Sequence, residues 1–269
     1  MPSDFPSSPR SAARPSIVAL RGVTKTFANG TQALGGLDLD VAAGEFVSLL
    51  GPSGCGKSTA LRLIAGLSEP SSGEITWAID RAAAAPRGRD IGFVFQEPTL
   101  MPWTTVARNV ALPLDLRHTP EADVTPRVAA AIERVGLSQF RDAYPRELSG
   151  GMKMRVSIAR ALATDPTLLL MDEPFAALDE ITRFKLNNDL LDLWRALRKT
   201  VVFVTHSVFE SVYLSGRIVV MTPRPGRVFK ELRIDAPYPR EESFRTSAEY
   251  AGYCRLASEA LTQAMAAAA

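Results

Sequence analysis

The sequence predicts an α/β protein with a mostly parallel sheet and an inserted helical lobe. Short apolar runs of strand length alternate with segments of helical spacing, which is typical of a parallel sheet covered by helices. The segment GPSGCGKS at 51–58 fits the phosphate-loop pattern G-x-x-x-x-G-K-[ST] at every fixed position. Between about 98 and 166 the strand patterns disappear and helical spacing takes over. We therefore expect a phosphate-binding core interrupted by a separate helical lobe.

The first hundred residues predict strands on both sides of the phosphate loop. We expect strands over 17–23 and 37–41, separated by a turn at 28–30, and a strand over 46–50 directly before the loop. A helix over 57–67 would place Leu61, Ile64 and Ala65 on one side. After a turn at 70–73, strands are expected over 75–79 and 91–95. This strand–loop–helix context supports the phosphate-loop interpretation.

The rest of the chain predicts the helical lobe, the end of the core and a tail. Helical spacing covers 105–112, 124–135 and 152–164, and an apolar run at 168–171 predicts a buried strand. A helix over 181–197 would carry one apolar face, made of Leu186, Leu190, Leu193, Trp194 and Leu197. Strands follow at 201–205 and 218–221. We divide the chain into a flexible leader (1–15), a domain (16–236, helical lobe about 97–165) and an amphipathic helical tail (237–269).

Composition and charge narrow the class of protein. The chain is 46% hydrophobic and 22% charged, which suits a globular fold, and its net charge of +2 gives no reason to expect a nucleic-acid partner. Its two cysteines, Cys55 and Cys254, are far apart, which favours a reducing compartment over a disulfide framework. No apolar run approaches the ~18–20 residues that span a bilayer. We expect a cytoplasmic protein that reaches a membrane only by docking onto another protein.

The phosphate loop has the residue types that a nucleotide needs. Its glycines let backbone N–H groups approach phosphate oxygens, and the N-terminus of the following helix adds about half a positive charge. Lys57 is expected to reach the β- and γ-phosphates, and Ser58 to bind Mg²⁺. Cys55 occupies a free position, where a structural role is expected, with alkylation of a thiol beside the phosphates as the alternative. The predicted nucleotide-binding residues of this segment are Gly51, Pro52, Ser53, Gly54, Cys55, Gly56, Lys57, Ser58 and Thr59.

Four further polar residues stand at the ends of three predicted strands. Asp172 and Glu173 end the apolar run LLLMDE, where Asp172 would hold Mg²⁺ and Glu173 would polarise the attacking water. Gln96 would bind Mg²⁺ or the water, and His206 would contact the γ-phosphate. Each of the three strand ends has a plainer interpretation. Asp172 would cap a turn, Gln96 would be structural, and His206 would be a packing or surface residue. The order of the motifs favours the functional readings.

A second anion-binding segment is predicted at Ser149, Gly150 and Gly151, just before a helix. The plainer reading is an ordinary N-cap, since Ser is a favoured cap residue. Two successive glycines at a helix start are costly unless a ligand must approach the backbone. Because one nucleotide already fills the phosphate loop, this segment would bind the γ-phosphate of a partner's ATP in a two-fold dimer.

These motifs, in this order, resemble the nucleotide-binding subunit of an ATP-binding cassette (ABC) transporter over about 17–221. That family has a RecA-like core, a small antiparallel β lobe and a helical lobe. The resemblance implies that Phe27 stacks on adenine, that Ser149 to Gly151 are the signature motif, and that Asp179 ends a loop communicating across the dimer. There are two departures: Met152 replaces the usual Gln, and Phe27 replaces the commoner Tyr.

A narrower resemblance lies in QEPTLMPWTTV at 96–106 and NVALPL at 109–114, which is similar to the nitrate/sulfonate/taurine importer subfamily. It implies an ATPase that uses ATP and Mg²⁺ to drive uptake of a small solute. The implied partners are a second copy sharing two ATP sites, separate transmembrane permease subunits and, indirectly, an extracytoplasmic solute-binding protein. The implied place is peripheral, on the cytoplasmic face of the inner membrane. Trp103 is a candidate contact for the permease, with lobe core as the alternative.

Two other classes of protein remain open on the sequence. A soluble ATPase of the same superfamily, acting on nucleic acid or ribosomes, usually has tandem cassettes or long coiled-coil insertions, and neither pattern is present. A nucleotide kinase needs only the phosphate loop, so it does not explain Ser149 to Gly151, Gln96 or His206.

Overall fold

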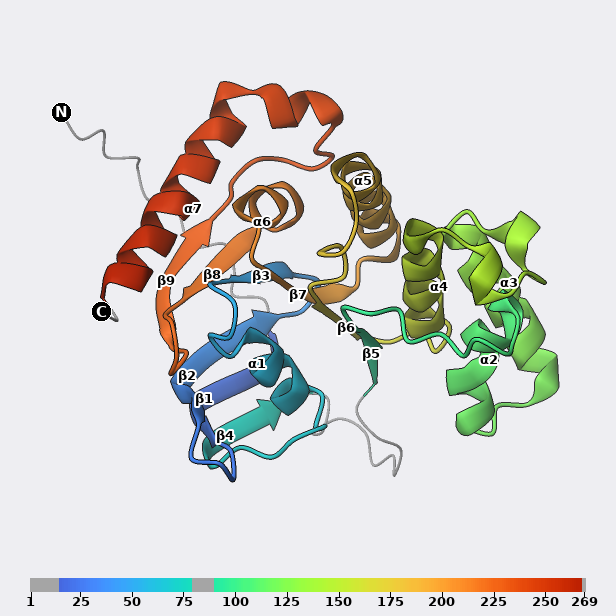
Figure 1. The fold of residues 1–269 in the computed structure, drawn as a ribbon, viewed down its shortest axis with the longest axis horizontal. Coiled ribbons are helices and arrows are strands. Elements are labelled where there is room, and N and C mark those ends of the chain that lie inside the picture. The colour runs from blue at the N-terminus through green and yellow to red at the C-terminus, as the bar shows by residue number, and fades with distance from the viewer. Residues whose placement is uncertain (1–14, 79–89, 268–269) are drawn as a thin grey trace.

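A six-stranded sheet forms the centre of this computed structural model, which describes residues 15–78 and 90–267 (Figure 1). Its strand order is β5-β6-β7-β3-β8-β9, and all neighbours are parallel except the antiparallel pair β8 and β9. The strands are β3 (Phe46–Leu50), β5 (Ile91–Val94), β6 (Leu168–Asp172), β7 (Thr200–Thr205), β8 (Arg217–Met221) and β9 (Val228–Arg233). This confirms the α/β class with a mostly parallel sheet.

The middle strands are buried on both faces, as expected for a parallel sheet covered on both sides. Every residue of β3, β6 and β7 is buried. On one face, α1 (Lys57–Ile64) and the antiparallel lobe complete the core. On the other face lie α4 (Gly150–Leu162), α5 (Glu180–Leu197), α6 (Val208–Leu214) and α7 (Ala248–Ala266). The apolar face predicted for α5 packs into this second cluster.

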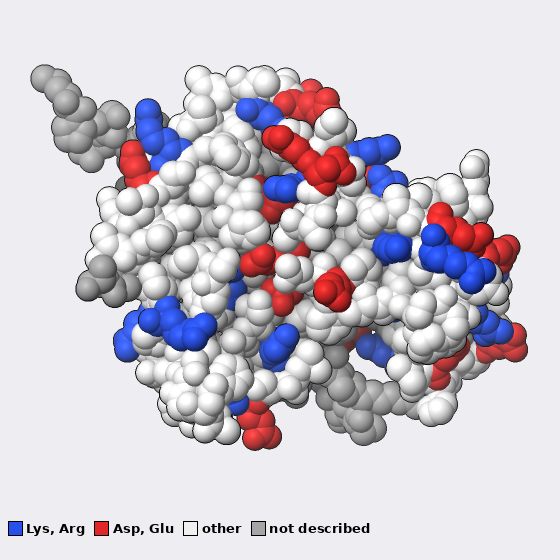
Figure 2. Space-filling view, viewed as in Figure 1, with Lys and Arg blue, Asp and Glu red and all other residues white. Residues whose placement is uncertain are grey.

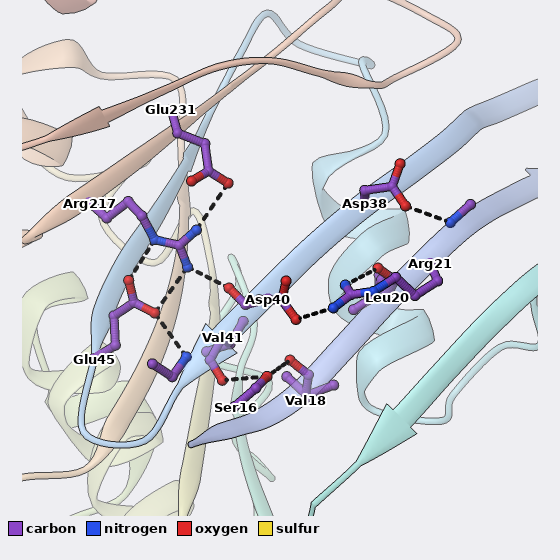
Figure 3. A network of polar contacts seen from close by, with 12 residues as sticks. Ser16, Val18, Leu20, Arg21, Asp38, Asp40, Val41, Glu45, Arg217 and Glu231 are labelled. Atoms are coloured by element: carbon purple, nitrogen blue, oxygen red, sulfur yellow. Dashed lines mark hydrogen bonds and ion pairs between the residues drawn. The ribbon is translucent and has the colours of Figure 1, made fainter. Parts of the chain in front are cut away.

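A small antiparallel sheet forms the β lobe, with the order β2-β1-β4. Its strands are β1 (Ser16–Thr26), β2 (Gln32–Ala42) and β4 (Ser72–Trp77). Arg217 of β8 joins this lobe to the central sheet (Figure 3). Its guanidinium donates to both carboxylate oxygens of Glu45 at 2.6 and 3.0 Å, to Glu231 at 3.0 Å and to the carbonyl of Asp40. Because this ion pair is mostly shielded from water, it fixes how the two sheets meet.

The helical lobe lies at one end of the molecule (Figure 1). It consists of α2 (Val106–Leu116), α3 (Glu121–Arg134) and α4, with 3-10 turns at Ser138–Phe140 and Pro145–Glu147. The lobe has its own apolar core, which includes Val110, Ile132 and Val156. Its position between β5 and β6 in the chain is the insertion that the sequence predicted.

The C-terminal segment wraps over the central sheet and is held there by a buried arginine. Arg240 donates five hydrogen bonds to carbonyl oxygens. Three of these oxygens lie at the end of α6, on Val212, Tyr213 and Ser215. The other two belong to Ile234 and Ala236, which precede Arg240 in the chain. After a 3-10 turn at Glu242–Thr246, α7 buries one face against the core. The helix α7 is therefore part of the packed fold.

The structure also differs from the predicted elements. Two were missed, α6 and β9, and the helix predicted over 57–67 ends at Ile64. The strand predicted over 91–95 ends at Val94, and Gly73 of the predicted turn belongs to β4. The leader at 1–15 lies almost wholly outside the described residues, as does the end of the strand predicted over 75–79. Segment ends are set by tertiary packing, so periodicity fixes them least well.

Candidate nucleotide-binding and hydrolysis site

The candidate site lies where β3, β6 and β7 end at the same edge of the central sheet. Parallel strands bring their carboxyl ends together, and open α/β sheets bind ligands at that edge. In the view that Figure 1 and Figure 2 share, acidic side chains lie near the middle of the molecule, close to where these strands end. The phosphate loop follows β3, Asp172 is the last residue of β6, and His206 directly follows β7.

Lys57 is the buried cation of the site, at the first position of α1. Its Nζ donates to the carbonyls of Gly51 at 2.8 Å and Pro52 at 3.0 Å, within its own loop. It also lies 3.7 Å from Oε1 of Glu173. Gly56, the N-cap of α1, has φ +103°, a left-handed conformation that favours glycine. The loop thus wraps the N-terminus of α1 with its lysine beside the acidic strand end.

Ser58 and Asp172 form the adjacent polar pair. The hydroxyl of Ser58 donates to Oδ1 of Asp172 at 2.7 Å. Burial raises the pKa of the Asp172 carboxyl, and the hydrogen bond from Ser58 opposes that shift. Both side chains offer oxygen ligands of the hard type that Mg²⁺ prefers. Within the described ranges, there is no cluster of three or more His, Cys, Asp or Glu side chains that would form a metal cage.

Glu173 lies between Lys57 and His206. Oε2 of Glu173 is 2.9 Å from Nδ1 of His206, and the two side chains come from different strand ends. The backbone of Glu173 has φ +45°, which is rare for a residue with a side chain and costs free energy. The fold keeps this strained conformation, which aims a carboxylate at the edge of the sheet next to the phosphate loop.

The loop that carries His206 is held by three hydrogen bonds that sequence reasoning missed. The hydroxyl of Thr205 donates to Oε2 of Glu210 at 2.6 Å, and the backbone N–H of Ser207 donates to Oγ1 of Thr205 at 2.9 Å. The N–H of Glu210 then donates to Oγ of Ser207 at 3.3 Å. Burial raises the pKa of the Glu210 carboxyl. These bonds fix the chain on both sides of His206.

A hollow of about 170 Å³ lies beside the phosphate loop. Its lining includes Phe27, Gly54, Gly56, Lys57, Ser58, Thr59, Glu173 and Arg224. Phe27 is partly exposed, with Nζ of Lys25 5.6 Å from the centre of its ring. Arg224 is a lining residue that sequence reasoning missed, and the only available signal was a basic residue in the turn 222–226 after a predicted strand.

Cys55 has the buried position expected of a structural residue and not that of an accessible thiol. Its side chain is 1% exposed, and burial raises the pKa of the thiol, although the nearby Lys57 lowers it. The side chain points into the apolar core beneath the loop. The thiol is therefore shielded rather than open to alkylation, because it is almost fully buried.

Gln96 is not brought into contact with the other predicted residues. It is exposed, two residues beyond the end of β5, and it makes no hydrogen bond with any described residue. Asp179 is the N-cap of α5 and accepts from the N–H of Thr182 at 2.9 Å, which lowers the pKa of its carboxyl. Gln96 thus lies in the segment after β5, and Asp179 at the start of α5.

The segment Ser149 to Gly151 starts α4, away from the phosphate loop of the same chain. Oγ of Ser149 accepts from the N–H of Met152 at 3.3 Å, so Ser149 is an N-cap, as in the plainer reading. Ser149 and Gly150 are exposed, but Gly151 is buried. A Cβ at Gly151 would lie 2.8 Å from Cγ2 of Thr182. Close packing of α4 on α5 is therefore one reason for glycine at position 151.

The family comparison agrees with this geometry. Residues 34–176 match the ABC transporter family, and the chain belongs to that family. It is an ATP-binding cassette with ATPase activity, built on a P-loop core. None of its described helices has the length and hydropathy that crossing a membrane would require.

Several relatives and solved structures are similar over most of the chain. An uncharacterized ABC transporter ATP-binding protein of Methanocaldococcus jannaschii is 49% identical, covering 87% of each chain. The aliphatic sulfonates import ATP-binding protein of Bacillus cereus is 44% identical, covering 84% of this chain and 89% of its own. A dimeric ATP-binding cassette bound to ADP and Pi, in a post-hydrolysis state, superposes with a TM-score of 0.69 at 36% identity, covering 82% and 100%. The structure of cbiO1 from Clostridium perfringens, part of a transporter complex, gives 0.73 at 28% identity, covering 86% and 94%.

Proposed function

We propose that this chain is the ATP-hydrolysing subunit of a membrane importer for a small solute of the sulfonate, taurine or nitrate type. The observation that carries the hydrolytic role is the arrangement at one sheet edge of Lys57, the Ser58–Asp172 pair and the Glu173–His206 pair. The import role and the solute class rest on similarity to the aliphatic sulfonates import protein and on the motifs after Gln96. The cassette would span 16–236, with a packed tail at 237–269.

Each residue has a chemical task in this proposal. The N–H groups of the phosphate loop and Lys57 bind the phosphates, and Phe27 stacks on the base. Glu173 orients the attacking water and accepts its proton, and His206 holds Glu173 through the 2.9 Å contact. Gln96 would join the site when its loop moves. His206 would also contact the γ-phosphate.

Mg²⁺ fits the donors of this site. Ser58 and Asp172 offer a hydroxyl and a carboxylate 2.7 Å apart, and a single protein carboxylate suits an ion that otherwise binds substrate phosphates and water. These two residues would hold the ion, with Gln96 as a further ligand. The ion supplies charge neutralisation on the phosphate oxygens.

A dimer with shared ATP sites accounts for the residues that one chain leaves apart. Ser149 and Gly150 present an exposed helix start that could face the phosphate loop of a second copy. Ile181, two residues after Asp179, is 83% exposed, and Phe209, three residues after His206, is 62% exposed. Exposed apolar side chains at the starts of α5 and α6 fit a surface that a second copy covers.

The helical lobe offers a surface for separate permease subunits. Trp103 is 74% exposed, so its ring is not part of the lobe core, and Leu116 is also exposed. Large apolar side chains in water support a docking role for this lobe. Docking there would place the chain peripherally on the cytoplasmic face of the membrane, and a solute-binding protein would deliver the solute outside.

The test is affinity capture of the tagged full-length Glu173→Gln protein from detergent-solubilised membranes with ATP and Mg²⁺, followed by mass spectrometry. We expect a multi-span permease whose gene neighbour is a solute-binding protein, and weaker capture by Trp103→Ser. Recovery of ribosomal or other soluble partners only would contradict the import role and leave the ATPase chemistry standing.

A further inference from the structure

The turn between β8 and β9 lies directly against the phosphate loop. Nε and Nη2 of Arg224 both donate to the carbonyl oxygen of Gly54, each at 3.1 Å. The other N–H groups of this guanidinium make no hydrogen bond with any described residue. Arg224 also lines the hollow that contains Phe27 and Lys57. The side chain thus reaches from the sheet edge to the loop that would bind the phosphates.

Gly226 brings the same turn still closer. A Cβ at Gly226 would collide with the carbonyl oxygen of Cys55, so only glycine allows this contact between two backbones. Gly226 is also bonded to β2, because its N–H donates to Ala33 at 2.9 Å and its carbonyl accepts from Gly35 at 3.0 Å. One turn therefore contacts both the phosphate loop and the strand that follows the Phe27 segment.

These contacts fall on the carbonyl side of the phosphate loop. A loop of this kind binds anions with its N–H groups, so its carbonyl groups need partners on the opposite side. Lys57 bonds to two of these carbonyls, but in the proposed function its Nζ moves to the phosphates. Arg224 bonds to a different carbonyl of the loop, that of Gly54, and it adds positive charge beside a polyanionic ligand.

We infer that Arg224 is a positioning residue that sets the affinity of the phosphate loop for nucleotide, and that the 222–227 turn couples this loop to the β lobe. The inference rests on the proposed function, which places the nucleotide at Lys57. It predicts an effect on binding rather than on the chemical step, because no contact joins Arg224 to Glu173 or His206. A lysine at 224 keeps the charge but lacks the pair of donors on one planar group.

The experiment measures binding of a fluorescent ATP analogue and steady-state ATPase activity in the full chain. The variants are Arg224→Met, Arg224→Lys and Lys57→Ala, with Arg233→Met as a matched control at an exposed position at the end of β9. We expect Arg224→Met to raise Kd and KM about tenfold, with kcat within about twofold, the order expected from losing one or two charge-assisted hydrogen bonds. Arg224→Lys should recover only part of this affinity.

The outcomes distinguish the role of Arg224 from the proposed nucleotide site at Lys57. An unchanged Kd for Arg224→Met, with binding lost in Lys57→Ala, would overturn this inference and keep the nucleotide site. Full recovery by Arg224→Lys would overturn the role of the paired hydrogen bonds. Normal binding by Lys57→Ala would instead contradict the proposed function. If Arg224→Met melts at a lower temperature, Gly226→Ala gives the second test: weakened nucleotide binding is expected, and normal binding would overturn the coupling.

Discussion

The buried cation at the nucleotide edge, Lys57, and the buried cation of the C-terminal segment, Arg240, are held in different settings. At the edge, Lys57 bonds to carbonyls of its own loop, and Glu173 adopts a left-handed backbone conformation. Around Arg240, five carbonyl oxygens accept from one buried guanidinium, whose charge also lies over the rings of Tyr238 and Phe244. The first region keeps strain and charge facing a ligand site, whereas the second joins α6 to the C-terminal segment.

This difference predicts that the two regions separate activity from stability. Changes at the edge should affect catalysis with little loss of folding free energy, because strain there is retained for function. Changes around Arg240 should affect folding free energy and leave the chemistry of folded molecules unchanged.

The largest expected effect is on catalysis, at Glu173. Glu173→Gly removes the carboxylate and should lower kcat by about 10²–10⁴-fold, the range for loss of a general base. Because glycine accepts positive φ, unfolding in urea should show stability unchanged or raised by up to about 1 kcal/mol. Arg198→Gly is the matched control, since exposed Arg198 has φ +51° outside the site. It should change stability in the same way and leave kcat intact. A strongly destabilised Glu173→Gly would contradict the strain argument.

A smaller effect, on stability, is expected at Arg240. Arg240→Met leaves buried carbonyls of Val212, Tyr213 and Ser215 without their donor, so the free energy of unfolding should fall by about 2–4 kcal/mol. Urea unfolding of the full chain measures this, with exposed Arg233→Met as the control. Activity per folded molecule should stay within twofold. An Arg240→Met protein with unchanged stability, or one that is folded but inactive, would contradict the assignment of stability to this region and activity to the other.

The smallest effect concerns Cys55. Burial raises the pKa of this thiol, so less thiolate is present at any given pH than for an exposed cysteine. In a Cys254→Ser background, iodoacetamide should react slowly at pH 7 and faster as the pH rises beyond the ordinary thiol range of about 8.5. Labelling rates followed by mass spectrometry measure this. Fast labelling at neutral pH would show that the loop opens far more than the structure indicates.

Sequence reasoning predicted the parts of the fold that depend on local pattern. The phosphate loop, the buried strands and the apolar face of α5 all follow from spacing within a short window. It missed α6, which has only seven residues and follows β7 after a two-residue gap, and β9, an edge strand with exposed charges such as Lys230. These two elements are defined by what they pack against.

The residues of the candidate site also differ in whether a local sequence pattern could predict them. Lys57 and Ser58 were predicted from the phosphate-loop pattern, and Asp172, Glu173 and His206 from their places at strand ends along one edge of a parallel sheet. Arg224 and Glu210 were not, since their roles depend on hydrogen bonds across the fold, to Gly54 and Thr205. Gln96 was predicted at a strand end, but β5 ends two residues earlier and leaves its side chain exposed.

The central claim is that two copies share ATP between the phosphate loop of one and the Ser149 segment of the other. The most direct test is light scattering of Glu173→Gln with ATP and Mg²⁺, alone and combined with Ser149→Arg. We predict a stable dimer of Glu173→Gln only with ATP, and a monomer that still binds ATP when Ser149→Arg is added. A Glu173→Gln protein that stays monomeric, or a dimer that persists with Ser149→Arg, would contradict the account.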